Sequence, residues 1–247
     1  MSRLFLPRHS LTLAENQNSG NLCRMKKNLT TDSPLLFSQS SADFKLDCPN
    51  FNIEKHFINQ RVEPVAGVDE VGRGPLAGPV VAASVILDPE NLPQGLNDSK
   101  KLTAKRREEL FFEIMATSTI AISSVPENLI DQINIRQASL LAMRQSVHGL
   151  AKKPQMLLVD GRDIPSGLQC HAQAFIKGDG RSLSIAAASI IAKVVRDRQM
   201  IFAASLFPEY GFENHKGYGT RAHLEAIAKY GPCPLHRQSF SPMNRLI

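Results

Sequence analysis

The stretch GVDEVGRGPLAGPVVAASVIL, residues 67–87, sets two adjacent acids and a segment rich in glycine and proline between two apolar runs. The runs PVAGVD and PVVAASVIL are rich in valine, which is typical of strands, and the Gly/Pro segment marks the connection between them. The stretch therefore predicts two consecutive strands, with Asp69 and Glu70 at the point where the first strand gives way to a turn.

The size and composition of the chain bound its class. It has 247 residues, of which 43% are hydrophobic, enough for one sizeable domain with a tail or for two small domains. The longest apolar runs, residues 80–87 and 185–195, are shorter than the roughly 20 residues of a membrane-spanning helix. We therefore expect a soluble globular protein without a membrane span.

Charge and cysteine usage narrow the expected setting. The net charge of +6 and a pI near 9.3 favour a polyanionic partner only mildly, because 29 basic against 23 acidic residues is common in ordinary proteins. The four cysteines form no C-x-x-C pair, so neither a zinc site nor a disulfide framework is indicated. This pattern favours a reducing compartment, and we expect a cytoplasmic protein.

The first 60 residues differ from the rest of the chain. They contain seven serines and seven asparagines and show neither a helical nor an alternating period. We predict that residues 1–60 form a disordered or loosely packed extension and that residues 61–247 form the domain. The start MSRLFLPRHSLTL lacks the apolar centre of a secretory signal; a transit peptide and a true start at Met25 both remain open.

Beyond the first two strands, the pattern alternates between strands and helices. Thr103 is suited to cap a helix, and IAISSV at residues 120–125 and MLLVD at residues 156–160 read as strands. A further strand is expected near residues 168–175. Together these elements predict an α/β domain with a mixed sheet. The inner positions expected on the two middle helices are Leu110, Phe111, Ile114, Met115, Ile133, Leu140, Leu141 and Val147.

The carboxyl-terminal part of the chain is predicted to be mainly helical. Residues 184–204 form an alanine-rich run with helical character, and residues 221–231 form a shorter one. Gly231 is placed to end the second helix, because glycine is strongly favoured just after a helix terminus.

Two acids are expected at one edge of the sheet. Asp69 ends one apolar strand and Asp160 ends another, and open α/β sheets carry their sites at the carboxyl ends of such strands. Clustered carboxylates repel one another, and a hard divalent ion compensates them. The plainer alternatives are a turn role for the Asp of VDG and opposite faces of a strand for Asp69 and Glu70.

Other short motifs are weak by themselves. Asp179 lies between glycines, where an Asx turn is the ordinary role, and Tyr218 in HKGYGT is ordinarily a packing residue. A dinucleotide-binding fingerprint is disfavoured, because the glycines are spaced as Gly72, Gly74 and Gly78 and prolines stand where its helix should begin.

Seven short blocks follow one another along the chain. They are DEVGRGPLAGPV (residues 69–80), DSKKL (98–102), LLVDG (157–161), IKGD (176–179), SIAAASIIAKVVRDR (184–198), HKGYGT (215–220) and PLHRQSF (234–240). Taken together and in this order, the blocks resemble bacterial ribonuclease HII, the type 2 ribonuclease H. The resemblance runs from about Val65 to Pro242.

The resemblance implies a ribonuclease H-like fold, a five-stranded mixed sheet flanked by helices, with a helical portion at the C-terminus. It implies an endonuclease that cleaves the RNA strand of RNA–DNA hybrids and incises 5′ to single ribonucleotides in duplex DNA, leaving 3′-hydroxyl and 5′-phosphate ends. The implied cofactor is Mg²⁺ or Mn²⁺, with two ions in the substrate complex. We expect a monomer that acts on nucleic acid.

The family motifs also imply roles for individual residues. Asp69, Glu70 and Asp160 correspond to the metal-binding carboxylates and Asp179 to the fourth acid. Because the chain turns at the glycines, Glu70 need not obey strand alternation. The turn Gly72-Arg73-Gly74 would contact the ribose, and Tyr218 would pack on the sugar of the next nucleotide. The plainer alternative for a basic residue on a helix is a solvated face. The basic residues that could follow the nucleic-acid backbone include Lys100, Lys101, Lys177, Arg181, Lys193 and Arg196.

Two departures from the family pattern and two alternatives stand beside this interpretation. Gly180 replaces the usual Ser and Val195 a frequent Thr, which affects only expected phosphate contacts. One alternative is a silent hybrid-binding protein, against which the retention of four acids argues, since carboxylates repel phosphates. The other is a type 3 ribonuclease H, for which the turn would read G-T-G.

Overall fold

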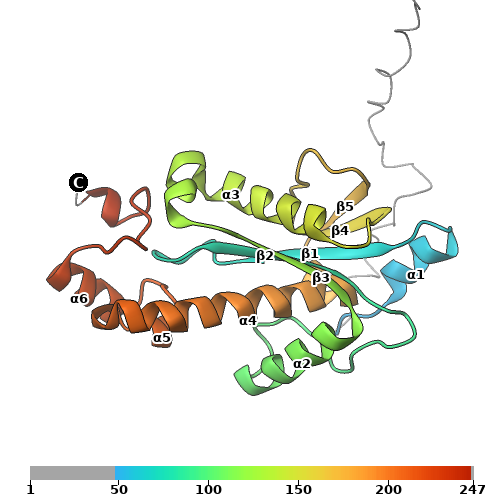
Figure 1. Cartoon of the computed structure of the whole chain (residues 1–247), viewed down its shortest axis with the longest axis horizontal. Helices are drawn as coiled ribbons and strands as arrows, with labels where there is room; N and C mark the ends of the chain where they lie inside the picture. The colour runs from blue at the N-terminus through green and yellow to red at the C-terminus, as the bar shows by residue number, and fades with distance from the viewer. Residues whose placement is uncertain (1–47, 246–247) are drawn as a thin grey trace, which may run out of the picture. The chain divides into compact units, whose positions relative to one another are not determined.

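The fold is a layered α/β arrangement around one sheet, seen in a computed structural model that describes residues 48–245 (Figure 1). These residues belong to one unit that spans Phe37–Ile247. The strands are β1 (Val65–Val71), β2 (Val80–Ile86), β3 (Thr119–Val125), β4 (Met156–Asp160) and β5 (His171–Phe175). The α-helices are α1 (Asn52–Asn59), α2 (Ala104–Thr117), α3 (Glu127–Gly149), α4 (Leu183–Leu206), α5 (Phe212–His215) and α6 (Arg221–Tyr230).

The sheet has the order β3-β2-β1-β4-β5. The first three strands form an antiparallel meander, and β4 and β5 run parallel to β1. The predicted five-stranded mixed sheet is therefore confirmed. Three parallel strands with a common direction also bring their carboxyl ends to one edge, which is where the candidate site lies.

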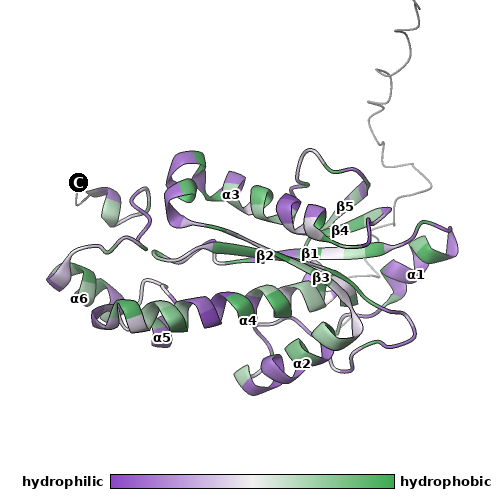
Figure 2. Cartoon of the chain, in the orientation of Figure 1, coloured by the Kyte–Doolittle hydropathy of each residue, from purple (hydrophilic) through white to green (hydrophobic). Residues whose placement is uncertain are grey.

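Helices cover both faces of the sheet, with α3 on one side and α4 and α2 on the other (Figure 1). On β2, Val81 and Ala83 contact the α4 side, and Val80 and Ala82 contact the α3 side. Because both faces are covered, the strand is a continuous apolar run. Figure 2 shows the hydrophobic residues along β2 and α4 accordingly.

Helix α4 lies unusually close to β1. A Cβ atom at Gly67 would come within 2.2 Å of the Ser184 carbonyl carbon, so a larger residue would push the first turn of α4 off the strand. The close approach lets side chains of α4 reach the carboxyl end of β1.

Most of the predicted elements are confirmed. The strand at residues 156–160 has the predicted bounds, and Thr103 caps α2 by accepting a hydrogen bond from the Arg106 amide. Gly231 follows α6, with a φ of 75°. The C-terminal portion is helical as expected, with α5, α6 and short 3-10 turns.

One inner position was predicted wrongly, because Met115 is 48% exposed. In α3, Leu140 and Leu141 pack against the core as predicted but are half-buried, whereas Ala138 and Ala142 are fully buried. The backbone of α3 is non-helical at Asn134, where φ is 66°, so the spacing counted across that residue does not follow one helical face.

The expected boundary at residue 60 is also wrong for the described part of the extension. Helix α1 occupies residues 52–59, and its Ile53 and Phe57 are buried with Val65 and Phe175. The polar composition of residues 1–60 as a whole hid one amphipathic helix. Residues 1–47, including Cys23, lie outside the described residues, in which Cys48, Cys170 and Cys233 are free.

Over residues 48–245, no helix is long and apolar enough to cross a membrane.

A buried acid joins α1 to α4. Glu54 is fully buried, and its Oε1 accepts hydrogen bonds from the Ser182 hydroxyl at 2.6 Å and the Ser184 amide at 2.8 Å. Burial raises the pKa of Glu54, and the hydrogen bonds from Ser182 and Ser184 oppose the rise. Glu54 thus satisfies donors at the N-terminus of α4.

We predict that Glu54→Leu lowers the free energy of unfolding by about 2–4 kcal/mol, because two buried donors lose their acceptor. Glu54→Gln keeps an acceptor oxygen and should lose less. Since the folded-state pKa is raised, the ionised carboxylate destabilises the fold increasingly as pH rises above the ordinary Glu value. The Gln variant should therefore gain on the wild type between pH 5 and pH 8 in urea unfolding.

The exposed Glu63→Gln serves as the matched control for this series. Equal stability of Glu54→Leu and the wild type would contradict the assigned role of α1.

Candidate active site

Acids lie at or near the carboxyl ends of three neighbouring parallel strands, β1, β4 and β5. Val68 of β1 pairs with Val159 of β4, so Asp69 and Asp160 are the next residues on adjacent strands. Asp160 in turn pairs with Phe175 at the end of β5, and Asp179 follows in the 3-10 turn η2 (Gly178–Gly180). The structure thus brings the four predicted acids to one edge of the sheet, with Glu70 next to Asp69.

Asp69 faces α4. It is 5% exposed, and its carboxylate is hydrogen-bonded by Ser189 of α4 and by the Glu70 amide at 2.8 Å. The Ser189 hydroxyl lies 2.9 Å from that of Ser99, in the loop before α2. A chain of hydroxyls therefore ties Asp69 to the DSKKL segment.

Glu70 faces the opposite side of the sheet. β1 continues to Val71, and Glu70 keeps its partner in β2, so Glu70 follows strand alternation although the nearby turn did not require it to. The strand is regular because the turn begins only at Gly72. Glu70 lines a small cleft of about 100 Å³ together with Asp160 and residues of α3. The Arg73 guanidinium donates a hydrogen bond to the Glu70 carboxylate at 3.2 Å.

Burial and repulsion hold these acids in an unfavourable state. Burial raises the pKa of Asp69 well above its ordinary value, and the charges of Asp160 and Glu70 raise it further. The pKa of Glu70 rises to about 7, through burial and the charge of Asp160, against the opposing effect of Arg73. Burial also raises the pKa of Asp160, although the Gly178 amide donates to it at 2.7 Å.

Asp179 has a cationic neighbour. Burial and the charge of Asp160 raise its pKa, and the Lys100 ammonium lies 3.7 Å from its Oδ2. Lys100 also lies 3.9 Å from Asp98. Burial lowers the pKa of Lys100, but the surrounding acids outweigh it and the net shift is upward. Lys100 therefore stays charged beside the cluster.

The glycine-rich turn after β1 is held by two buried arginines. Arg237 donates to the carbonyls of Gly72 (2.6 Å), Arg73 (3.0 Å) and Gly78 (2.7 and 3.0 Å). Arg196 donates to the carbonyls of three further residues, Pro79 (2.9 Å), Lys216 (3.0 Å) and Ala77 (3.1 Å).

Gly72 is required at its place in that turn. Its φ is +97°, and a Cβ atom there would lie 2.2 Å from Nε of Arg196. The turn and the buried guanidinium therefore fit only with glycine.

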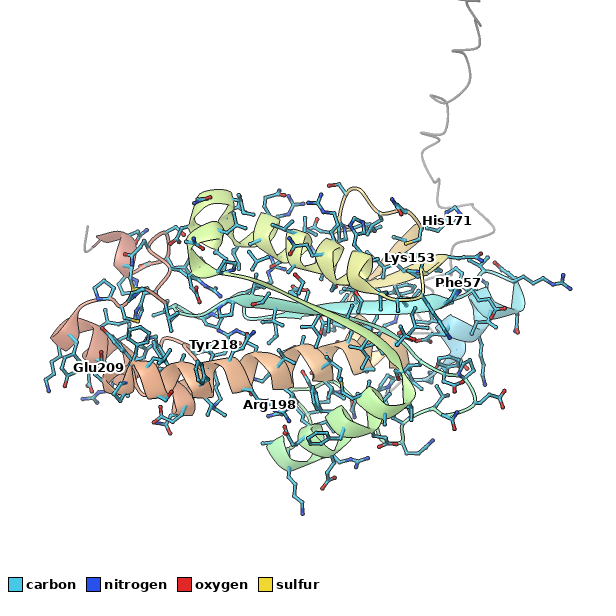
Figure 3. All side chains as sticks on the ribbon, in the orientation of Figure 1. Phe57, Lys153, His171, Arg198, Glu209 and Tyr218 are labelled. Atoms are coloured by element: carbon cyan, nitrogen blue, oxygen red, sulfur yellow. The ribbon has the colours of Figure 1, made fainter. Side chains whose placement is uncertain are left out.

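Tyr218 lies beside the same turn. A Cβ atom at Gly74 would be 3.7 Å from Cε1 of the Tyr218 ring, and the ring is 43% exposed. Figure 3 places it along α4, toward the end of the molecule that carries Glu209 and away from Phe57. The structure thus joins the predicted ribose-contacting turn and the predicted sugar-packing residue.

The predicted basic residues divide into two groups. Lys100, Lys101 and Lys177 are exposed, and Lys193 is half-buried in an ion pair with Asp197 at 2.7 Å. Arg196 is fully buried and donates to carbonyls, and Arg181 is 5% exposed beside the Phe175 ring. The expectation that both arginines line the substrate surface was wrong, because the fold uses them internally.

Two further residues that organise the site, Arg237 and Ser189, were not predicted individually. Arg237 appeared only inside the PLHRQSF block, and Ser189 only inside the alanine-rich helix. Neither position carries a local signal, since each acts on residues more than a hundred positions away. A cavity of about 470 Å³ is lined by residues around α1, the start of β1, the end of β2 and the junction between α2 and β3, and none of the four acids lines it.

The donor chemistry of the cluster fits a hard divalent ion. All four acids supply oxygen, which Mg²⁺ and Mn²⁺ prefer, and their mutual repulsion would be relieved by a cation. No three His, Cys, Asp or Glu side chains in residues 48–245 converge closely enough to form a metal-binding group as they stand. Asp69 and Glu70 point to opposite faces, and Asp160 lies beside both.

Comparison with known proteins identifies the family. A family model described as Ribonuclease HII matches residues 66–243. The chain belongs to the ribonuclease HII family. Ribonuclease HII of Agrobacterium fabrum (strain C58) is 57% identical over 221 residues, which cover 90% of this chain and 100% of the relative. That of Rhizobium etli (strain CIAT 652) is 54% identical, covering 90% of this chain and 94% of the relative.

Solved structures agree on the fold. The ribonuclease H2 from Pyrococcus horikoshii OT3 superposes with a TM-score of 0.64 at 29% identity, covering 74% of this chain and 96% of that one. The Bst-RNase HIII in complex with Mn²⁺ superposes with a TM-score of 0.59 at 19% identity, covering 73% and 68%, which supports the fold alone. The ribonuclease H-like fold predicted from the sequence is confirmed.

Family membership gives the general activity. A ribonuclease HII is an endoribonuclease that acts on the RNA of RNA–DNA hybrids, and enzymes of the ribonuclease H family depend on divalent metal ions. The predictions of a nuclease and of a nucleic-acid substrate are therefore confirmed.

We predict that Mg²⁺ or Mn²⁺ raises the melting temperature of this ribonuclease HII more at pH 8 than at pH 5.5. Because the pKa values of the site acids are raised in the folded protein, the fold loses stability as these acids ionise with rising pH, through about pH 7 for Glu70. A bound cation offsets that loss.

Melting in metal and in EDTA at each pH isolates this difference. Asp160→Asn should shrink it, and the exposed Glu225→Gln on α6 should leave it unchanged. A metal-induced shift of equal size at both pH values would contradict the coupling.

Proposed function

We propose that this ribonuclease HII also incises duplex DNA at single embedded ribonucleotides, on their 5′ side, leaving 3′-hydroxyl and 5′-phosphate ends. One observation carries the proposal: the acids at the ends of β1 and β4 lie next to a rigid glycine turn and an exposed tyrosine. Such a site can recognise one ribose and cut next to it.

The turn is suited to read a 2′-hydroxyl. Glycine lets backbone amides and carbonyls approach a sugar closely, and a 2′-hydroxyl both donates and accepts hydrogen bonds. The carbonyls of Gly72 and Arg73 already accept from Arg237, and each carbonyl oxygen has a second lone pair. Because Arg237 fixes their direction, the turn is organised before substrate binds.

Tyr218 is suited to test the neighbouring sugar. The Tyr218 side chain is exposed and borders Gly74. When a ribose binds at the turn, the sugar of the following nucleotide would therefore contact the tyrosine ring. A flat aromatic surface accepts any base and responds to sugar geometry. We propose that this contact favours a deoxyribose after the ribose.

The acids would hold the divalent ions. Asp69, Glu70 and Asp160 are the proposed ligands and Asp179 the fourth active-site acid, with Lys100 beside it. A bound Mg²⁺ or Mn²⁺ would help to activate the attacking water and to stabilise the departing 3′-oxygen. The proposal is supported by the oxygen-only donor set and by the divalent-metal dependence of the family.

The chain's own groups contribute orientation. Ser189 and the Glu70 amide fix the Asp69 carboxylate, and the Gly178 amide fixes that of Asp160. The proposed surface for the nucleic-acid backbone includes Lys100, Lys101, Lys177 and Lys193. We further propose a cytoplasmic monomer, supported by a site built within one chain and by the free described cysteines.

The test uses a labelled DNA duplex with one ribonucleotide, incubated with Mg²⁺, Mn²⁺ or EDTA, and product ends mapped on a gel. We expect metal-dependent incision on the 5′ side of the ribonucleotide. Asp160→Asn should reduce the rate by at least about a thousandfold, because a metal-binding carboxylate becomes neutral, while the far-UV spectrum is retained.

A long RNA–DNA hybrid serves as the parallel substrate, and Asp163→Asn as the nearby control variant. Cleavage of the hybrid without incision at the single ribonucleotide would overturn the proposal while leaving the general activity intact. Near-normal activity of Asp160→Asn would remove that residue from the metal site.

A further inference from the structure

Three histidines, two of them buried and one half-buried, form a cluster behind the loop that carries Tyr218. His223 in α6 and His236 are fully buried, and their Nε2 atoms lie 3.0 Å apart. His215 stacks on His223 at a centroid distance of 4.4 Å. The proposed function uses Tyr218 from this part of the chain and none of the three histidines.

The hydrogen bonds allow one arrangement of protons. The Cys233 amide lies 2.9 Å from Nδ1 of His236 and donates to it, whereas the Cys233 carbonyl is farther, at 3.3 Å. Neutral His236 therefore carries its proton on Nε2 and donates to Nε2 of His223. His223 must then carry its proton on Nδ1, which donates to the Tyr218 carbonyl at 2.9 Å.

The surroundings keep these rings neutral. His223 is packed against His215, His236 and the Phe212 ring, and Tyr210 borders His236. Burial lowers the pKa of His223 to about 4; the bond to the Tyr218 carbonyl opposes this, and His215 and His236 lower it further. Burial also lowers the pKa of His236. Both rings are thus neutral near pH 7.

The same loop is attached to the glycine turn. The Leu76 amide donates to the Gly217 carbonyl at 2.8 Å, and a Cβ atom at Gly217 would lie 2.4 Å from the Ala77 carbonyl oxygen. The Gly217 amide also donates to Nδ1 of His215 at 3.2 Å. Tyr218 is therefore held from the turn on one side and from the histidines on the other.

We propose that His236 and His223 are positioning residues, which fix the Tyr218 backbone through a directed hydrogen-bond relay and so hold its ring over Gly74. The inference rests on the proposed sugar-reading role of Tyr218. The relay runs from the Cys233 amide through both imidazoles to the Tyr218 carbonyl. A buried imidazole can change partners only by losing a hydrogen bond. The relay therefore fixes the backbone of Tyr218, a residue of the proposed substrate surface, from inside the core.

The kinetic test compares His223→Leu with His223→Asn. The Asn amide nitrogen can take the place of Nδ1 and keep the donor to the Tyr218 carbonyl, whereas Leu removes it. We expect roughly a tenfold loss of incision at a single ribonucleotide for Leu and a smaller loss for Asn. The exposed His171→Leu, at the other end of the sheet, is the matched control (Figure 3).

A double-mutant cycle separates positioning from general damage. Once Tyr218→Ala has removed the ring, adding His223→Leu should cause little further loss, because the relay acts through that ring. Additive losses, or an Asn variant as impaired as Leu, would overturn the proposal.

A second readout needs neither activity nor a variant. In protein labelled with ¹⁵N-histidine, the ring couplings should report an Nδ1–H tautomer for His223 and an Nε2–H tautomer for His236 at pH 7. The reversed tautomers would overturn the relay whatever the enzyme cuts. Failure of the wild type to incise at single ribonucleotides, with these tautomers present, would instead count against the proposed function alone.

Discussion

Two guanidinium groups buried in a loop of backbone carbonyls are the constraint on which the site depends. Arg196 and Arg237 are fully buried, and burial lowers the pKa of Arg237 to about 10, with Arg196 as the next cause. Two like charges in the interior are costly unless each donor is satisfied. The carbonyls of the glycine-rich turn satisfy them, and only a planar fork such as arginine can bind several at once.

This constraint explains why the turn between β1 and β2 is rich in glycine. The segment between β1 and β2 must aim its carbonyls inward, and it can do so only where glycine permits a positive φ, as at Gly72 and Gly78. The outer surface of the same turn is then presented to solvent next to Tyr218. The acids lie at the other side of the turn, where β1 ends, so the position of one group fixes the position of the other.

The acid cluster, unlike the arginines, consists of buried charges that the fold leaves destabilised. Burial raises the pKa of all four acids, and the charge of a neighbouring acid raises the pKa of Asp69, Glu70 and Asp179 further, so the protein holds a destabilised group of charges at the edge of its sheet. Perturbed carboxylates of this kind mark functional sites, because ligand binding relieves the repulsion. A turn held by hydrogen bonds beside a cluster of mutually repelling carboxylates suits a nuclease, because cations and a sugar must be bound at a fixed distance from each other.

The strands, their parallel ends and the position of the acids at one edge of the sheet could be predicted from the sequence, because apolar runs that stop at an acid are local signals. Glu70 shows the limit of such reasoning, since its direction depended on how far β1 continues. Arg196 was named among the bases that could follow the nucleic-acid backbone, because its burial against carbonyls of distant residues leaves no local signal, and α1 was missed within a polar segment. The histidine relay joins residues separated along the chain, which a local pattern does not reveal.

The most direct test of the central claim is Arg237→Lys, assayed by hybrid cleavage and by amide hydrogen exchange of residues 72–79. Lysine keeps the charge but cannot reach three carbonyls together, so kcat should fall at least about tenfold and exchange in the turn should rise while the far-UV spectrum is retained. The exposed Arg198→Lys on α4 is the control (Figure 3). Wild-type kcat with unchanged exchange in the turn would contradict the account.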